Sequence, residues 1–245
     1  MNLIGNTILI TGGTSGIGLE LANQLQQRGN DIIICSRSRE KLESARAENA
    51  ALVTYRCDVS NPDDCKKMVS WLEAHKPALN VLINNAAVSH TMDFIEDDAA
   101  LEKASIEIET NLTAPIRLIK QLYPMLSRNA APKIINITTG LIYAPRSIYP
   151  IYNATKSALH SFTQVLRIQV EKSPAQVIEV QLPAVDTPWH GGNPPKIAIP
   201  VEVAVKEMMS GLEKGREEIK VGKVKLLYIL SRIVPGYALR KVNSL

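Results

Sequence analysis

The sequence predicts an α/β protein with a doubly wound parallel sheet and helices on both faces. Short β-rich runs alternate with segments of helical periodicity along the 245 residues, and such alternation is typical of parallel sheets. Several runs are apolar almost throughout, as expected for strands covered on both faces. The sequence has no internal repeat and no long linker. Residues 1–245 are therefore expected to form a single domain.

Six runs are predicted to be the strands, and the segments between them are long enough for crossover helices. The runs are residues 7–11, 31–35, 52–57, 81–84, 133–138 and 177–182. Ser38 is expected to cap a helix that begins at Arg39. Asn61, followed by Pro62 and two aspartates, is a stronger start signal, because proline and acidic side chains favour the first helical turn.

A glycine-rich turn follows the first predicted strand. Gly12, Gly16 and Gly18 permit a tight turn, close approach of a pyrophosphate to the backbone, and close helix–strand packing. The free N–H groups at the start of the next helix favour phosphate. A glycine turn in isolation is often only structural, but its position after the first strand favours a Rossmann-type dinucleotide site. The other loop residues expected to contact the cofactor are Thr14, Ser15 and Ile17.

The end of the second strand is expected to decide the choice of cofactor. An acidic residue there binds a ribose 2′-hydroxyl, whereas a cation accepts a 2′-phosphate. The sequence has Ser36 and Arg37 at this point and no acid, so NADP(H) is predicted to be preferred over NAD(H). The alternative is that Arg37 and Arg39 are solvated loop charges.

Two later turns are further candidates for cofactor contacts. Asp58, beside Val59, follows the third strand and either binds the adenine edge or caps a turn. Asn85, Ala86 and Ala87 end the fourth strand, where small side chains would let a cofactor lie flat. Asparagine-rich turns also form without any ligand.

Tyr152 and Lys156 are spaced i, i+4, which places a phenol and an ammonium on one face of a helix. In isolation such a pair is usually an amphipathic surface pair. Together with the upstream glycine loop, it indicates a dinucleotide bound beside an acid/base tyrosine. This combination points to hydride transfer.

The segment from Pro183 to Pro200 contains five prolines and is expected to be a loop. Long loops in compact domains are often lids or binding loops, and residues 184–200 are predicted to be the substrate loop. Trp189, Pro194 and Pro195 favour an apolar pocket wall, with a packed lid as the alternative.

Residues 220–245 are predicted to form a basic, amphipathic C-terminal extension. Its apolar positions recur at helical spacing and are Leu226, Leu227, Leu230, Ile233, Val234 and Tyr237. This stripe is suited to packing on the protein's own core, on a second subunit or over the substrate cleft. Contact with anionic lipid is the less favoured alternative.

Composition excludes several functional classes. The formal net charge is +4 and aromatic residues make up 4%, with no basic run interleaved with aromatics, so no nucleic-acid partner is expected. The four histidines have no ligand spacing, so no metal site is expected. Three cysteines without a C-x-x-C pair indicate a reducing compartment. With no signal-peptide pattern and no apolar stretch of spanning length, the expected location is cytoplasmic.

These motifs together resemble the short-chain dehydrogenases/reductases over nearly the whole chain. Residues 11–18 resemble the TGxxxGIG loop, residues 84–87 the NNAG motif with Ala87 in place of glycine, and Tyr152-x-x-x-Lys156 the catalytic pair. Asn111 resembles the family's helix asparagine, and Thr139 occupies the place of its serine. Residues 183–187, 152–163 and 225–240 together look closest to the DltE-like oxidoreductase branch.

The resemblance implies an enzyme that transfers a hydride between NADP(H) and a small-molecule carbonyl or secondary alcohol. Tyr152 would be the general acid/base, beside Lys156, which also binds the nicotinamide ribose. Thr139 would hold the substrate oxygen, and Asn111 would position a water. The residues implied to cover the nicotinamide are Pro183, Val185 and Thr187. A homo-oligomer is also expected.

The main alternative is a non-catalytic NADP-binding sensor on the same fold, because fold does not imply function. A membrane-associated assembly protein is a third class, supported only by the tail. Neither the substrate nor the physiological direction of the reaction follows from these motifs.

Overall fold

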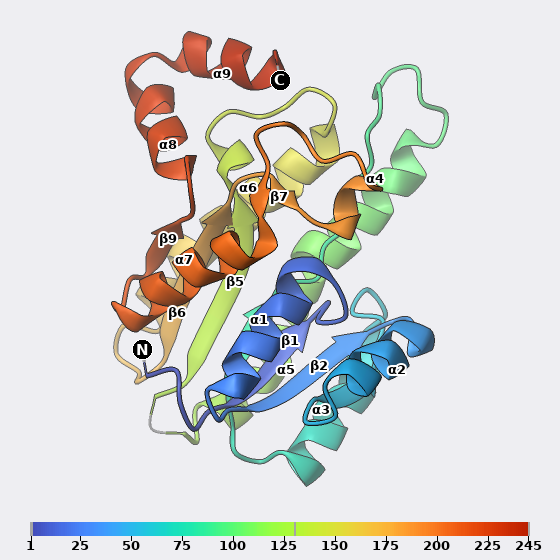
Figure 1. Cartoon of the computed structure of the whole chain (residues 1–245), viewed down its shortest axis with the longest axis vertical. Coiled ribbons are helices and arrows are strands. Elements are labelled where there is room, and N and C mark those ends of the chain that lie inside the picture. Colours follow the sequence, from blue (N-terminus) through green and yellow to red (C-terminus); the bar gives the residue numbers. More distant parts are fainter. Residues whose placement is uncertain (1, 130, 245) are drawn as a thin grey trace.

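The computed structural model describes residues 2–129 and 131–244 and contains a seven-stranded, wholly parallel sheet in the order β3-β2-β1-β4-β5-β6-β9 (Figure 1). The strands are β1 Thr7–Thr11, β2 Asp31–Ser36, β3 Val53–Arg56, β4 Leu79–Asn84, β5 Lys133–Thr139, β6 Gln176–Leu182 and β9 Glu218–Lys220. The predicted fold class is therefore confirmed, and all six predicted strands are present.

Helices lie on both faces of the sheet (Figure 1). They are α1 Gly16–Gln27, α2 Arg39–Glu48, α3 Pro62–His75, α4 Ala100–Ile108, α5 Ala114–Leu126, α6 Pro150–Gln169, α7 Val201–Glu213, α8 Val224–Ile233 and α9 Pro235–Asn243. Both predicted starts are confirmed. The Ser38 side chain accepts a hydrogen bond from the N–H of Lys41, and the Asn61 side chain accepts bonds from the first turn of α3.

Each face of the sheet has its own apolar core. Ile8 and Ile10 of β1 pack in the core that contains α1 and α7, whereas Leu9 packs in the core that contains α3 and α5. Successive side chains of a strand point to opposite faces. A strand covered on both sides is therefore apolar at most positions, which explains the continuous runs in the sequence.

The seventh strand corrects the predicted start of the C-terminal extension. The extension was expected to begin at residue 220, but that residue ends the strand β9 (residues 218–220), which pairs with β6 at the sheet edge. Only Ile219 of the three is buried, and its neighbours are charged. Because an edge strand this short has no apolar run, hydrophobic patterning did not reveal it.

The loop between β6 and α7 is closed at its base. The two-residue strands β7 Val185–Asp186 and β8 Ile199–Pro200 pair with each other in parallel. A short 3-10 turn, Pro188–His190, lies between them and ends at Gly191, whose φ is +57°. The two ends of the predicted substrate loop are thus held together by the β7–β8 pair.

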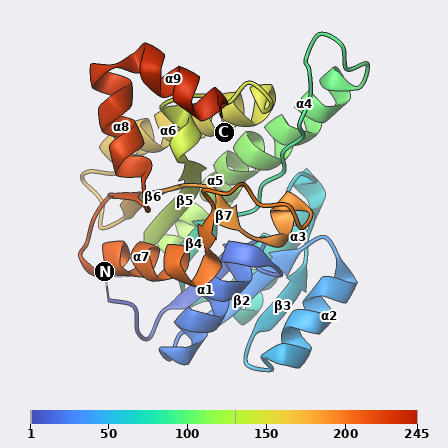
Figure 2. The ribbon, with the colours of Figure 1, turned by 45° about the horizontal axis from the view of Figure 1, so that its top comes forward.

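Helices α8 and α9 form an arch that lies beside α6 in both ribbon views (Figures 1 and 2). Leu227 and Leu230 pack with Leu141, next to the buried Ala238 and Val242 of α9. Of the three packing alternatives, the structure has the tail on the protein itself, against the segment that precedes α6.

Polar contacts fix the same junction. The Asn243 side chain accepts a hydrogen bond from the Ser147 N–H at 2.7 Å and donates one to the Pro145 carbonyl at 3.0 Å. The predicted apolar stripe is split, because Leu226 and Ile233 point outward and are 54% and 73% exposed. Among the residues that the structure describes, no helix is both long and apolar enough to cross a membrane.

Truncation after Gly222 is expected to lower the melting temperature by about 5–10 °C, because it uncovers Leu141 and frees the 140–147 segment. Differential scanning calorimetry measures this change. The matched control is the double substitution of Leu226 and Ile233 by serine, which removes outward apolar groups and should leave the melting temperature unchanged.

Little binding of the intact chain to anionic vesicles is expected at physiological salt. Unchanged melting on truncation, with salt-sensitive vesicle binding by the intact chain, would favour the membrane instead.

Candidate active site

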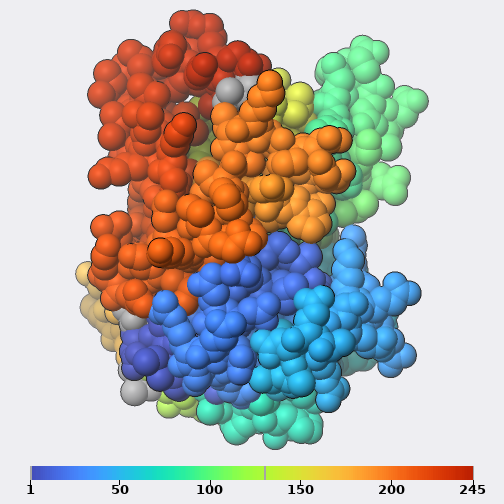
Figure 3. Space-filling view, viewed as in Figure 1, coloured from blue at the N-terminus to red at the C-terminus, as the bar shows by residue number. Residues whose placement is uncertain are grey.

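The predicted site residues meet at the carboxyl edge of the sheet. The strand order reverses between β1 and β4, and ligands bind at such a switch point in doubly wound sheets. The 184–200 loop lies over the middle of the face seen in Figure 3, between the C-terminal segment (red) and the α4 region (green).

The glycine loop has a geometry that side chains would block. Gly12 and Gly16 have φ of +65° and +50°. A Cβ on Gly12 would stand 2.9 Å from the Ala86 Cα, and one on Gly18 would stand 2.4 Å from the Gly12 carbonyl oxygen. The Ser15 side chain makes no capping bond at the start of α1. The start of this helix therefore offers backbone donors, which suit a phosphate.

Thr11, which the sequence analysis did not single out as a ligand-site residue, ties two of the predicted turns together. Its Oγ1 accepts hydrogen bonds from the N–H groups of Asn85 and Ala86, each at 3.0 Å. The Asn85 amide donates to the carbonyls of Thr11 and Gly12 at 3.0 and 3.2 Å. The Asn85 side chain is thus occupied in holding a backbone cradle, and Ala86 and Ala87 leave room above it.

Arg37 follows β2 at the same edge of the sheet and is exposed. Its carbonyl accepts a bond from Arg56 Nε at 3.3 Å, but its guanidinium has no ion-pair partner among residues 2–129 and 131–244. The neighbouring Arg39 pairs with Glu43 at 3.8 Å. A free guanidinium at the end of β2 fits an anionic group such as a 2′-phosphate.

Asp58 and Val59 have structural roles of their own. Asp58 Oδ1 accepts bonds from the N–H and hydroxyl of Ser60 at 3.0 and 2.7 Å. Asp58 therefore caps a turn, which is one of the two roles that the sequence indicated. Val59 is buried, and its carbonyl accepts a bond from Arg117 at 3.1 Å. A role for either residue in binding adenine stays a prediction.

Tyr152 and Lys156 share one face of α6, and the Lys156 Nζ lies 5.9 Å from the centre of the Tyr152 ring. Lys156 is 2% exposed and donates to the Ile137 carbonyl at 2.8 Å. Burial lowers the pKa of Lys156 to about 8, and the Glu179 carboxylate opposes that effect. The ammonium is therefore held on the sheet side of the helix.

Burial raises the pKa of Tyr152 above its ordinary value, and the Thr139 hydroxyl opposes this. The Glu107 carboxylate raises the pKa of Tyr152 further. This direction is opposite to the one that acid/base catalysis near neutral pH needs. A cation bound beside the ring would reverse it.

Thr139 lies before α6 in the chain, and Asn111 faces that helix from the neighbouring π-helical turn. Thr139 ends β5, donates to the Leu182 carbonyl and accepts from the Leu141 N–H, both at 3.3 Å. Asn111 is buried in the π-helical turn Glu109–Thr113, where its amide bonds both backbone groups of Val88 at 2.8 Å and Thr155 at 3.2 Å. Asn111 thus connects the turn after β4 to α6.

The loop after β6 reaches both halves of the site. Thr187 lies 3.1 Å from the position that a Cβ on Gly16 would take. Val185 is buried beside Ile199 in the β7–β8 pair. The Trp189 ring stands edge-on to the Tyr152 ring, with centroids 5.9 Å apart. Pro183, at the root of this loop, is half-buried.

Sequence reasoning missed the pair His90–Glu107. Glu107 is fully buried, and one of its oxygens accepts bonds from the N–H and Nδ1 of His90 at 2.7 and 2.9 Å. Burial raises the pKa of Glu107, and His90 opposes that effect. A single glutamate in a helix gives no signal of its burial, so only the contact between α4 and the segment after β4 revealed this pair.

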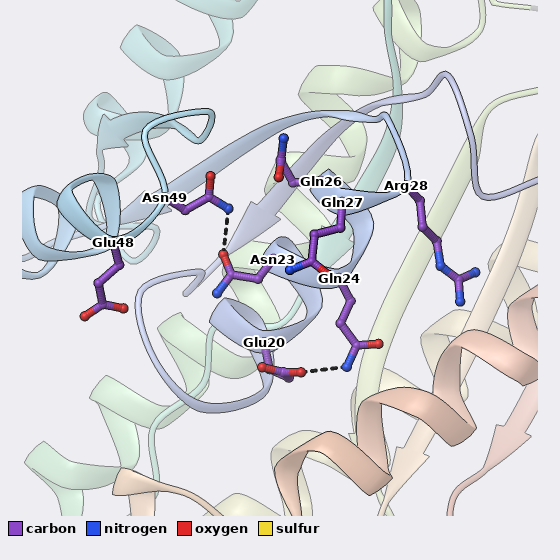
Figure 4. Close-up of a pocket in the computed structure, with 8 residues that line it drawn as sticks. All are labelled: Glu20, Asn23, Gln24, Gln26, Gln27, Arg28, Glu48 and Asn49. Atoms are coloured by element: carbon purple, nitrogen blue, oxygen red, sulfur yellow. Dashed lines mark hydrogen bonds between the residues drawn. The ribbon is translucent and has the colours of Figure 1, made fainter.

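Two pockets of the described residues lie outside the predicted cofactor cradle. The pocket of Figure 4 is lined by polar side chains of α1 and α2, including Asn23, Gln24 and Asn49, and by none of the predicted site residues. A second pocket, of about 490 Å³, lies between residues 91–94 and 147–150, next to the start of α6. Within the described ranges no group of three acidic, histidine or cysteine side chains is arranged to hold a metal.

Comparison with known proteins decides the family. A model of the short chain dehydrogenase family matches residues 6–197. The chain belongs to this family. It is 38% identical over 224 residues to a protein described as the uncharacterized oxidoreductase DltE of Bacillus subtilis, with 89% of each chain covered. The chain is therefore an oxidoreductase of alcohol or carbonyl groups, in the DltE-like branch of the family.

Solved structures of the family have the same fold. A short chain dehydrogenase from Burkholderia cenocepacia in complex with NADP superposes with a TM-score of 0.87 at 23% identity and covers 99% of both chains. One from Burkholderia phymatum in complex with NAD has a TM-score of 0.83 at 18% identity, covering 98% of this chain and 96% of that one. The shared fold thus holds either nicotinamide cofactor.

Proposed function

We propose that this protein is an NADP(H)-dependent oxidoreductase that uses Tyr152 as general acid/base on a carbonyl or secondary alcohol. The observation that carries the proposal is the buried Lys156 ammonium one helical turn from Tyr152. The pair lies at the same sheet edge as a glycine cradle that has no room for side chains. The alternative, an amphipathic pair on the protein surface, would leave the lysine exposed, whereas Lys156 is buried.

The residues of the cradle fit a dinucleotide. The backbone N–H groups at the start of α1 would hold the pyrophosphate, and Ala86 and Ala87 would leave the floor flat. Pro183, Val185 and Thr187 would cover the nicotinamide end. The bound nicotinamide supplies or accepts the hydride, and the protein supplies orientation and electrostatics.

In the reduction direction, Tyr152 would donate its phenolic proton to the oxygen of a carbonyl whose carbon receives the hydride. The product is an alcohol, and the tyrosine is left as a phenolate that must be reprotonated from solvent. The Lys156 ammonium stabilises that phenolate. Asn111 would position a water for the return of the proton. In the oxidation direction each transfer runs in reverse.

Thr139 would orient the substrate oxygen by donating its hydroxyl proton. To do so it would give up its hydrogen bond to the Leu182 carbonyl. That bond is weak, because its oxygen–oxygen distance is 3.3 Å. Trp189 would form the wall of the pocket beside Tyr152.

The preference for NADP(H) is supported by Arg37, whose guanidinium is unpaired within the described ranges, and by the lack of an acid at position 36. The other parts of the proposal are a small-molecule partner, no nucleic-acid partner and no stable membrane contact.

A cytoplasmic location is supported by three free, buried cysteines. A homo-oligomer is supported by outward apolar side chains on α6, Val165 at 50% and Ile168 at 71% exposure.

The experiment that tests this proposal is a panel of aldehydes, ketones and secondary alcohols, assayed with NADPH and NADH, together with direct titration of both cofactors. Turnover of any carbonyl or alcohol supports the enzyme. Tight NADPH binding without turnover of any panel member would favour the non-catalytic sensor.

Substitution of Thr139 separates its hydroxyl from its methyl group. Thr139→Ser keeps the donor and should remain active, whereas Thr139→Ala should lose at least tenfold in turnover, because an oriented donor to the substrate oxygen is removed. Steady-state kinetics on the best panel substrate measure both. Equal rates for the serine and alanine variants would remove Thr139 from the mechanism.

A further inference from the structure

The sheet face beneath α6 carries several buried polar side chains. Asn136 of β5 donates to the Thr163 hydroxyl of α6 at 2.9 Å, and Thr138 donates to the Glu179 carboxylate of β6. Hydrogen bonds are directional, so they fix the position of a helix more narrowly than apolar packing does. The helix held in this way is the one that carries Tyr152 and Lys156.

Glu179 is the charged member of this layer and is fully buried. One of its oxygens accepts the Thr138 bond, and the other lies 2.7 Å from the Nδ1 of His160. His160 follows Lys156 by one turn on the same helix, and Thr138 follows Ile137, whose carbonyl accepts the Lys156 bond. Both partners of Glu179 are therefore immediate neighbours of the groups that hold Lys156.

A buried charge is costly unless it is paired and hydrogen-bonded. Lys156 is also buried, and in the described chain no carboxylate lies within ion-pair distance of its Nζ. Burial lowers the pKa of Lys156, and the Glu179 carboxylate opposes that effect, which favours the ammonium form. The backbone of β5 connects the two groups, since the Ile137 carbonyl accepts the Lys156 bond and the next residue, Thr138, donates to Glu179.

We propose that Glu179, held by His160 and Thr138, is the counter-ion of the Lys156 ammonium and a positioning residue for the Tyr152–Lys156 pair. This inference rests on the proposed function for its catalytic consequence, although the electrostatic contact itself does not require it. The mechanism derived above assigns no role to Glu179 or His160.

Other charged and titratable groups surround the same carboxylate. From α6 and the segment before it they are Lys156, His160 and Tyr143, and from β9 they are Glu218 and Lys220. Glu218 pairs with Lys220 at 2.8 Å and is partly exposed. Glu218 therefore belongs to the same cluster but has its own cation, which makes it a suitable control.

The test is a titration of Lys156 followed by NMR of protein labelled with ¹³Cε-lysine, with the signal assigned by its loss in Lys156→Arg. Glu179→Gln keeps the size and the hydrogen-bonding groups but removes the charge. In this variant the pKa of Lys156 should fall by about one pH unit from its native value of about 8, because the anion that favours the ammonium is gone. Glu218→Gln should titrate like the native protein.

A second variant, His160→Gln combined with Glu179→Gln, replaces the imidazole and the carboxylate by two neutral amides and should show the same fall. It covers the case in which Glu179→Gln alone folds poorly. In turnover assays, the loss of kcat at high pH should begin about one pH unit lower in both variants, with the KM for NADPH unchanged. A role in packing alone would lower melting without moving either titration.

A Lys156 titration unchanged in both variants would overturn the inference, whatever the enzymatic activity. The proposed function fails by a different result, namely native turnover by a Tyr152 variant, which leaves the Lys156 titration untouched.

Discussion

Tyr152→Phe is expected to lower turnover at least ~100-fold while folding and NADPH binding persist. The substitution removes the phenolic oxygen that donates the proton but keeps the ring, which packs edge-on against Trp189 and Tyr149. The proton must then come from water, which is neither oriented nor activated by Lys156. Turnover is measured by steady-state kinetics on the best substrate of the panel. Folding is measured by calorimetry, and NADPH binding by fluorescence titration.

Tyr149→Phe is the matched control. Tyr149 precedes α6 and contacts the Tyr152 ring, with centroids 6.2 Å apart, but it has no role in the proposed proton transfer. Its variant should retain most of the native turnover. If Tyr152→Phe were as active as Tyr149→Phe, the proposed mechanism would be wrong.

Arg37→Asp is expected to reverse the choice of cofactor. In the native protein NADPH should bind about ten- to hundredfold tighter than NADH, since a charge-assisted phosphate contact is worth about 1.5–3 kcal/mol. The aspartate would repel the 2′-phosphate and accept a bond from the ribose hydroxyl of NADH. Dissociation constants from fluorescence titration of both cofactors give the ratio directly.

Arg39→Asp distinguishes a specific contact from a general charge effect. Arg39 lies two residues further on, is exposed and is already paired with Glu43. The same change of charge at this position should alter the NADPH/NADH ratio by less than about threefold, because an exposed charge is screened by solvent and salt. Equal affinities for the two cofactors in the native protein would contradict the predicted preference altogether.

Local patterns in the sequence were enough to predict the sheet and its carboxyl edge. The six predicted runs match strands to within two residues at either end, because most positions of a strand covered on both faces are apolar. The glycine spacing and the Tyr152–Lys156 spacing are local, so the cradle and the helix face could be predicted from neighbours in the chain. The caps at Ser38 and Asn61 are local in the same way.

Only the tertiary structure decided which polar residues are buried and which partners they meet. Glu107 and Glu179 stand in segments whose sequence does not distinguish them from exposed glutamates, and their partners His90 and His160 are 17 and 19 residues away along the chain. Thr11, β9 and the packing of α8 and α9 on residues 140–147 likewise depend on contacts between distant segments. Such contacts are set by how the helices pack on the sheet, because local periodicity specifies which face of an element is buried but not what lies against it.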